Sequence, residues 1–165
     1  MYKLYGNGID DDAPAIQEML DSGVAAVILP PPQKHYCIGS TLKIHSNQTL
    51  QLPETAIIRL LPNSNCFMLI NQKAGDHDIS VVGGIWDYNN KQQHPHPGKV
   101  KPAQPIIVET PAPYPEDDVE HAGLPQYPNT YRGRIMRFYG VTRLSIHDLT
   151  LKDPVQYALE MGFVK

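Results

Sequence analysis

The adjacent carboxylates of the chain fall in two acidic runs, Asp10-Asp11-Asp12 and Glu116-Asp117-Asp118. Two carboxylates can serve as acid and base in hydrolysis only when both face one side of the fold. Neighbouring residues of a strand point to opposite faces, and carboxylates at the start of a helix favour the positive end of its dipole. We therefore assign no catalytic residue. The first run is interpreted as a helix entry and the second as a solvated loop.

The histidines and cysteines do not form a metal-binding pattern. His94 and His96 flank a proline, and His121 lies far along the same stretch. A metal site needs three or four ligands at fixed geometry, which this spacing does not supply. Cys37 and Cys66 lie in apolar runs, where a buried unpaired thiol is expected. Phosphate-loop, dinucleotide-binding and Gly-x-Ser-x-Gly motifs are absent, so we expect no metal and no cofactor.

The composition indicates one domain that turns often. The 165 residues are 41% hydrophobic and 19% charged, with 16 prolines and 12 glycines, which favours β-structure over a helix bundle. The net charge of -3 comes with no basic run, so nucleic acid is not an expected partner. No apolar stretch approaches the roughly 18 residues of a membrane span, and no secretion signal is visible. The compartment stays open: cytoplasmic if Met1 is the native start, secreted if it is not.

The sequence predicts one helix followed by short strands. Asp11 or Asp12 can accept the free amides of a first turn, Pro14 suits that turn, and Gly23 follows the end, which predicts a helix over residues 12–22. Ala15, Ile16, Met19 and Leu20 share its apolar face. Short β-branched and aliphatic runs then predict strands at residues 25–29, 35–38, 42–45, 49–52, 57–61, 67–70 and 79–82.

A weak internal repeat indicates how these strands are arranged. Leu50-Gln51-Leu52, Ile79-Ser80-Val81 and Leu144-Ser145-Ile146 each place two aliphatic residues around a polar one, and a tight bend and a second strand follow each triplet. Stacked coils require the same bend to recur, whereas a β-sandwich does not. We therefore predict an all-β, right-handed parallel β-helix, with the short helix as an N-terminal cap over the first coil. A sandwich remains the alternative.

The predicted single domain, residues 1–165, has four parts. Residues 1–24 are the entry and capping helix, 25–90 the first coils, 91–133 a proline-rich insertion, and 134–165 further coils. Within the insertion only Ile106-Ile107-Val108 looks like a strand. Irregular loops of this length are usually functional or disordered, so the insertion is either the wall of a cleft, which we favour, or a mobile flap.

Three stretches resemble the N-terminal part of glycoside hydrolase family 28, the polygalacturonase family of the pectin-lyase-like β-helix group. Residues 5–17 with 27–31 resemble the entry to the capping helix and the first coil. Residues 42–52 and 82–90 resemble the early coils, the latter through Gly83-Gly84 and Trp86-Asp87. Residues 140–154 are similar to the coil that precedes the active site. The family's Asn-Thr-Asp, Gly-His-Gly and Arg-Ile-Lys motifs do not occur here, and Asp10-Asp11-Asp12 is not the family's Asp-Asp pair, because it lies at the helix entry.

The resemblance implies a pectin-active hydrolase acting on an α-linked galacturonate polymer, with this chain expected to be inactive alone. Such a polymer is anionic, so cationic side chains on a cleft wall would pair with it. We predict substrate contacts at His94, His96, Arg132 and Arg134. Trp86 could stack on a sugar ring, although burial at a corner of a coil fits it equally well.

The alternative function is a non-catalytic carbohydrate-binding or structural β-helix module. Both functions share the fold. A β-helix that ends in an uncovered coil also exposes apolar side chains, here Leu159, Met161, Phe163 and Val164. We therefore expect self-association through these coil edges.

Overall fold

The computed structural model describes residues 3–94 and 133–165. Within these residues it has one α-helix, α1 (Ala13–Asp21), and one short 3₁₀ helix, η1 (Asn90–Gln92). The first strands are β1 (Ala26–Ile28), β2 (Tyr36–Ile38), β3 (Leu42–Ile44), β4 (Gln48–Gln51), β5 (Ile57–Leu60) and β6 (Leu69–Asn71). The remaining strands are β7 (His77–Val82), β8 (Ile85–Asp87), β9 (Met136–Tyr139), β10 (Thr142–His147), β11 (Thr150–Lys152) and β12 (Leu159–Gly162).

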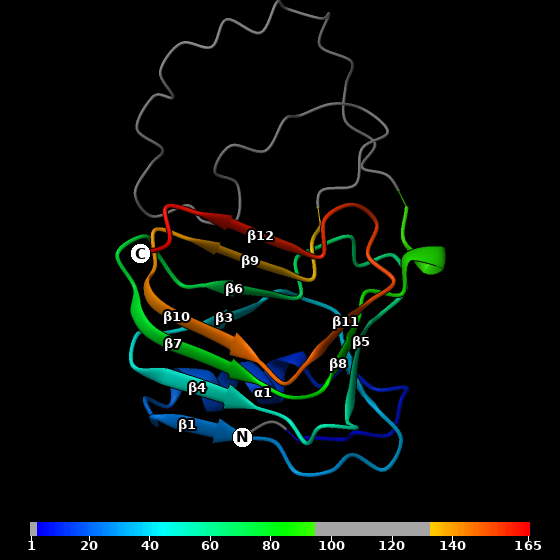
Figure 1. Ribbon diagram of the computed structural model, residues 1–165. Helices are drawn as coiled ribbons and strands as arrows, with labels where there is room; N and C mark the ends of the chain where they lie inside the picture. Colours follow the sequence, from blue (N-terminus) through cyan, green and yellow to red (C-terminus); the bar gives the residue numbers. More distant parts are fainter. Residues whose placement is uncertain (1–2, 95–132) are drawn as a thin grey trace, which may run out of the picture.

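The strands form three four-stranded sheets of one repeating order. The orders are β1-β4-β7-β10, β2-β5-β8-β11 and β3-β6-β9-β12, so each turn of the chain adds one strand to each sheet. Figure 1 shows the turns stacked upon one another, with β1 and α1 in the lower part of the view and β12 in the upper part. Every strand pair among the described residues is parallel. This β-helix-like stack rules out the antiparallel sandwich.

The predicted repeat is confirmed, and its register explains the core. A parallel sheet buries the same position of each strand when the pairing is in register. The inward columns, one per sheet, are Val27-Leu50-Val81-Ile146, Tyr36-Ile58-Trp86-Leu151 and Leu42-Leu69-Met136-Leu159. The first three members of each column are buried, and the last is half-buried. Each buried aliphatic side chain stabilises the fold by about 1.5 to 3 kcal/mol.

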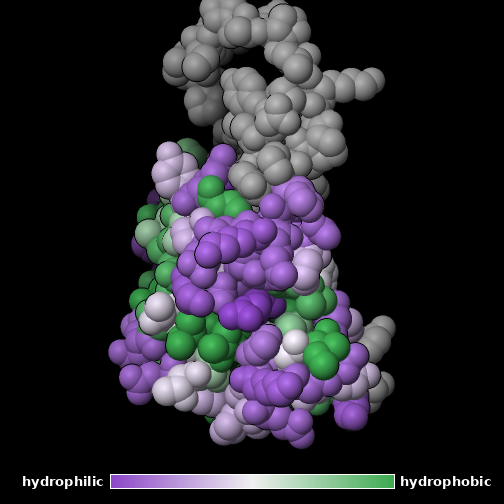
Figure 2. Space-filling model, turned by 90° about the vertical axis from the view of Figure 1, so that its right-hand side faces the viewer, coloured by the Kyte–Doolittle hydropathy of each residue, from purple (hydrophilic) through white to green (hydrophobic). Residues whose placement is uncertain are grey.

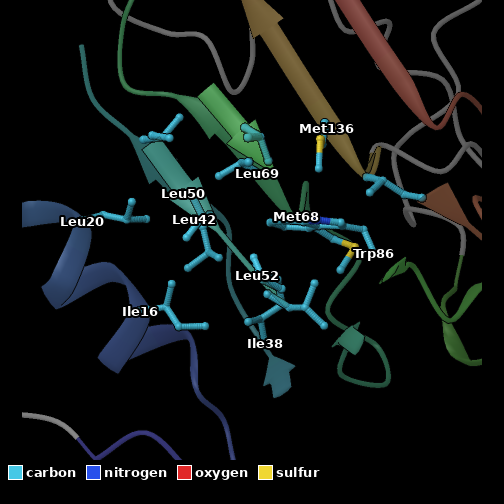
Figure 3. Packing of buried hydrophobic residues seen from close by; sticks show 14 of the residues in the cluster. Ile16, Leu20, Ile38, Leu42, Leu50, Leu52, Met68, Leu69, Trp86 and Met136 are labelled. Atoms are coloured by element: carbon cyan, nitrogen blue, oxygen red, sulfur yellow. The ribbon is translucent and has the colours of Figure 1, made fainter. Parts of the chain in front are cut away.

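The predicted capping helix is also confirmed. Ile16 and Leu20 are fully buried and point toward Leu42 of the first coil (Figure 3). Gln17 fixes the helix to β3, because its Oε1 accepts the Lys43 N–H at 2.8 Å and its Nε2 donates to the Lys43 carbonyl at 3.0 Å. Met19, expected on the apolar face, is instead 36% exposed, because the first coil covers only the part of the helix around Ile16 and Leu20.

The two aspartates at the helix entry have different roles. Asp11 Oδ1 accepts the Ala13 N–H of the first turn, and it also accepts the Gly39 N–H. Asp12 occupies the N-cap position without capping through its side chain. Its fully buried carboxylate accepts amide hydrogens from Gly6 and Cys37, which ties the entry segment to β2. Because buried charges are stable only when hydrogen-bonded, the Asp12 carboxylate has a structural role.

The differences from the predicted elements are local. β6 begins two residues later than predicted, and β9 and β12 had no predicted strand at all. Cys37 and Cys66 are free thiols, as predicted. The predicted strand at residues 106–108, and nearly all of the insertion, lie outside the described residues. In the part of the chain that the structure describes, no helix combines the length and apolarity needed to span a membrane.

Candidate functional site

The outer face of the β3-β6-β9-β12 sheet carries a charged column beside aromatic rings. On β9, Met136 and Phe138 point into the core and are fully buried, so Arg137 between them points outward. The in-register neighbours of Arg137 are Ile70 on β6 and Glu160 on β12. The parallel register therefore places Arg137 and Glu160 side by side, although they are far apart in the sequence.

Two guanidinium groups converge on the Glu160 carboxylate. Arg137 Nε lies 3.4 Å from Glu160 Oε1, and Arg134 Nε lies 3.2 Å from Oε2. The second pair is not aligned for a hydrogen bond, so the contact between Arg134 and Glu160 is electrostatic. The side chains of Arg134 and Arg137 are 8% and 4% exposed, respectively, whereas that of Glu160 is 32% exposed. Guanidinium groups in such a position favour negatively charged ligands.

Aromatic rings surround this ion-pair cluster. The Arg137 guanidinium lies 5.5 Å from the centre of the Phe67 ring, and that of Arg134 lies 5.5 Å from the Tyr157 ring. Tyr157 is 70% exposed. These cation–π contacts hold the guanidinium planes in place. An exposed ring beside a fixed cation offers both an apolar face and a charge to a ligand.

A second ring pair extends the same face. The Tyr139 and Phe163 rings pack edge to face with centroids 5.3 Å apart. The Tyr139 ring lies over Gly162, where a Cβ would stand only 2.7 Å from its Cδ2. We refer to Arg134, Arg137, Glu160, Tyr157, Tyr139 and Phe163 together as the arginine–aromatic face.

This face has the chemistry of binding rather than of hydrolysis. Cleavage of a glycosidic bond needs two carboxylates several ångströms apart. Among the described residues, Glu160 is the only carboxylate in the outward column of this sheet, and it is held by two arginines. The arrangement supports recognition of an anionic ligand.

A separate charged column lies on the outer face of the β2-β5-β8-β11 sheet. Asp87 pairs in register with Arg59 on one side and Lys152 on the other. Its Oδ2 accepts from Arg59 Nε at 3.0 Å, Arg59 Nη2 at 2.8 Å and Lys152 Nζ at 3.2 Å. Burial alone would raise the pKa of Asp87, but the Asn89 amide and the two cations together lower it.

The predicted site residues have different outcomes. Arg134 lies in the arginine–aromatic face. His94 is exposed, and its backbone N–H donates to Asn65 Oδ1 at 2.8 Å. His96 and Arg132 lie outside the described residues, so their substrate contacts stay predictions.

Trp86 requires a correction. Its side chain is fully buried between Ile58 and Leu151 in the inward column, and its Nε1 donates to the Gly83 carbonyl at 3.3 Å. A ring without exposed surface offers no face to a sugar, so Trp86 is a core residue. Its neighbour Asp87, one position along the strand, is the residue that points outward.

The sequence reasoning missed Arg137, Glu160 and the Arg59-Asp87-Lys152 column. An alternation signal was present in each case, because Arg137 stands between apolar residues in Ile135-Met136-Arg137-Phe138, and Glu160 stands between Leu159 and Met161. What was absent was the register that brings the two strands together.

Metal binding finds no support in residues 3–94 and 133–165, where no group of three His, Cys, Asp or Glu side chains is placed to hold an ion.

In comparisons with known proteins, the chain matches no protein-family model, no curated protein and no solved structure.

Proposed function

We propose that the arginine–aromatic face binds an anionic, pectin-like polysaccharide, as part of a polygalacturonase-like glycoside hydrolase. The observation that carries the proposal is the convergence of Arg134 and Arg137 on Glu160, next to the exposed Tyr157 ring. The charged groups suit the carboxylates of a uronate polymer, and the ring suits the apolar face of a sugar. The resemblance of residues 5–17 and 82–90 to family 28 supports the same substrate class.

The proposal includes a right-handed β-helix. Connections between parallel strands of one sheet are right-handed in about 98% of cases. Each sheet here is built entirely from such connections, since consecutive strands of a sheet are separated by one turn of the chain. The physical preference for right-handed crossovers therefore acts at every turn.

A binding assay tests the proposed ligand class. Oligogalacturonate should bind the purified chain, and a neutral galactan of the same length should not. Binding should weaken as salt rises, because salt screens the attraction between charges over about 10 Å at 0.1 M. Equal affinity for the two polymers, or none for either, would overturn the proposal.

Two variants link binding to this face. Tyr157→Ala removes an exposed ring and should weaken oligogalacturonate binding about tenfold. Tyr5→Ala is the matched control, because Tyr5 is 39% exposed and belongs to the entry segment before α1. Arg137→Lys keeps the charge but loses the planar fork, and it should also weaken binding. Circular dichroism of each variant separates loss of binding from loss of fold.

The single outward carboxylate of this face favours a second candidate, a carbohydrate-binding β-helix module without catalysis. Release of reducing ends from polygalacturonate discriminates between the two. We expect no turnover by the 165-residue chain. Turnover would show that catalytic carboxylates are present and would exclude the non-catalytic module.

A further inference from the structure

The Arg59-Asp87-Lys152 column borders a pocket on a different face from the proposed polysaccharide site. The pocket has a volume of about 340 Å³, and Asn89, Gln92 and Asp153 also line it. In Figure 2, which views the side of the molecule carrying β5, β8 and β11, hydrophilic residues gather across the middle of the surface and apolar residues flank them.

The charge balance of this pocket is opposite to that of the whole chain. Three cations line it, Arg59, Lys91 and Lys152, against two carboxylates, Asp87 and Asp153. The net charge of the pocket is therefore positive, whereas that of the chain is -3. Asp87 is 2% exposed and already accepts hydrogen bonds from two of the cations, so it repels an incoming anion less than a free carboxylate would.

The donors that remain have the geometry of a carboxylate site. Asp87 occupies Nε and one hydrogen of Nη2 of Arg59. In the described part of the chain, no acceptor contacts Nη1, so the outer edge of the planar guanidinium faces solvent, with the Arg59 side chain 35% exposed. The Lys152 side chain is 47% exposed, and its Nζ lies 3.2 Å from Asp87 Oδ2 and 3.4 Å from Asp153 Oδ2. A guanidinium edge beside an ammonium matches the two oxygens of a carboxylate.

The rim of the pocket adds neutral hydrogen-bonding groups. Asn89 Nδ2 donates to Gln92 Oε1 at 2.7 Å, which orients the Gln92 amide. With Oε1 used in this way, Gln92 Nε2 is left as a donor at the edge of η1. Amide donors beside a charged pair are suited to the hydroxyl groups of a sugar acid.

We propose that this pocket binds the carboxylate of a single sugar acid, with Arg59 and Lys152 as its cationic contacts. The site is separate from the arginine–aromatic face, and its existence does not depend on that face binding a polymer.

Amide NMR titration of the full chain with galacturonic acid tests the proposal. Saturable shifts should appear at Asn89, Asn90 and Lys152, and galactose at the same concentrations should produce none. Arg59→Gln should weaken the saturable binding about tenfold. Lys152→Gln should weaken the binding to a smaller extent. This variant should disturb the fold less than Arg59→Gln, because the Lys152 side chain is half exposed. Lys73→Gln, an exposed lysine outside the pocket, should leave the binding unchanged.

Three outcomes would overturn the proposal: shifts that galactose reproduces, unchanged binding in both the Arg59→Gln and Lys152→Gln variants, or inorganic phosphate binding more tightly than galacturonic acid. The last outcome would assign the pocket to phosphate-bearing ligands. Because Tyr157→Ala tests only the arginine–aromatic face, loss of polymer binding in that variant with intact galacturonic acid binding would show that the two sites are independent.

Discussion

The carbonyl oxygen of Leu52 occupies the space beside Gly83 that a side chain would need. A Cβ on Gly83 would stand 2.2 Å from this oxygen, and the residue has a φ of +77°. The contact joins the bends of two successive coils, and Gly83 can therefore accept neither a side chain nor an ordinary backbone conformation.

Gly83→Ala should lower the free energy of unfolding by about 3 kcal/mol or more, since it combines a backbone clash with a strained φ. Gly23→Ala is the matched control, because Gly23 has a φ of +79° with no atom within 4 Å of its Cβ position. That variant should cost about 1 kcal/mol, from backbone strain alone. Urea denaturation measures both. Equal losses would show that the close approach of Leu52 is unimportant.

Asp12→Asn should destabilise the fold by about 1 to 3 kcal/mol. The buried carboxylate accepts amide hydrogens from Gly6 and Cys37, and an asparagine would turn an NH₂ group toward one of these donors. Asp10→Asn should change the stability by less than about 0.5 kcal/mol, because Asp10 is exposed. The midpoints of urea denaturation compare the two variants. An Asp12→Asn variant as stable as the wild-type chain would contradict a structural role for this carboxylate.

Stability should depend on pH through Asp87. The pKa of Asp87 is lower in the folded chain than its unfolded value of about 3.9, so its ion pairs stabilise the fold at neutral pH. This contribution should be lost as the pH falls below about 4 and through the folded pKa. The stability difference between the wild-type chain and Asp87→Asn, measured from pH 7 to pH 3, should therefore shrink toward acid. A difference that grows toward acid would contradict the sign of the shift.

Fluorescence of Trp86 reports on the core and not on ligand binding. The buried indole should emit at short wavelength in the folded chain and shift to longer wavelength on unfolding. Saturating oligogalacturonate should leave the folded emission unchanged, because the Trp86 ring is fully buried. Saturable quenching of the Trp86 fluorescence by oligogalacturonate would show that Trp86 contacts the substrate after all.

The coil of β10, β11 and β12 should drive self-association. In the described part of the chain each of these strands is at an edge of its sheet, and only the start of β10 is paired further, through hydrogen bonds of Lys165 with Val141 and Arg143. Met161 is inward-facing yet 56% exposed. Unpaired strand edges beside apolar surface favour pairing with another chain. Sedimentation velocity should detect oligomers that grow with concentration, and Met161→Lys should reduce them. Ile9→Lys is the control, because Ile9 is an exposed residue of the entry segment. A monomer at all concentrations would contradict this expectation.

The sequence predicted the architecture because its signals are local. The bend after Leu52, Val81 and Ile146 recurs in the residues themselves, and the helix signals at Pro14 and Gly23 are within one turn of its ends. β9 was not predicted because Arg137 interrupts its apolar run, and β12 was not predicted because Glu160 and Gly162 weaken its pattern.

The candidate site could be predicted only in part because it depends on register. Arg134 was recognised as a cation, but its partner Glu160 comes from the next coil. No local pattern in the sequence specifies how many residues separate the two partners. Trp86 and Asp87 illustrate the same limit. The sequence places them together at a bend, and only the pairing of β8 with β5 and β11 decides that the indole points inward and the carboxylate outward.

The strand pairing also joins the two described segments of the chain directly. Strands β9 to β12 all follow residue 132, yet they pair with β6, β7 and β8, which precede residue 95. Two separate polypeptides, residues 1–94 and 133–165, would therefore share three sheets and one core. Such a protein is suited to fragment complementation, in which a reporter divided between the halves becomes active only when they assemble.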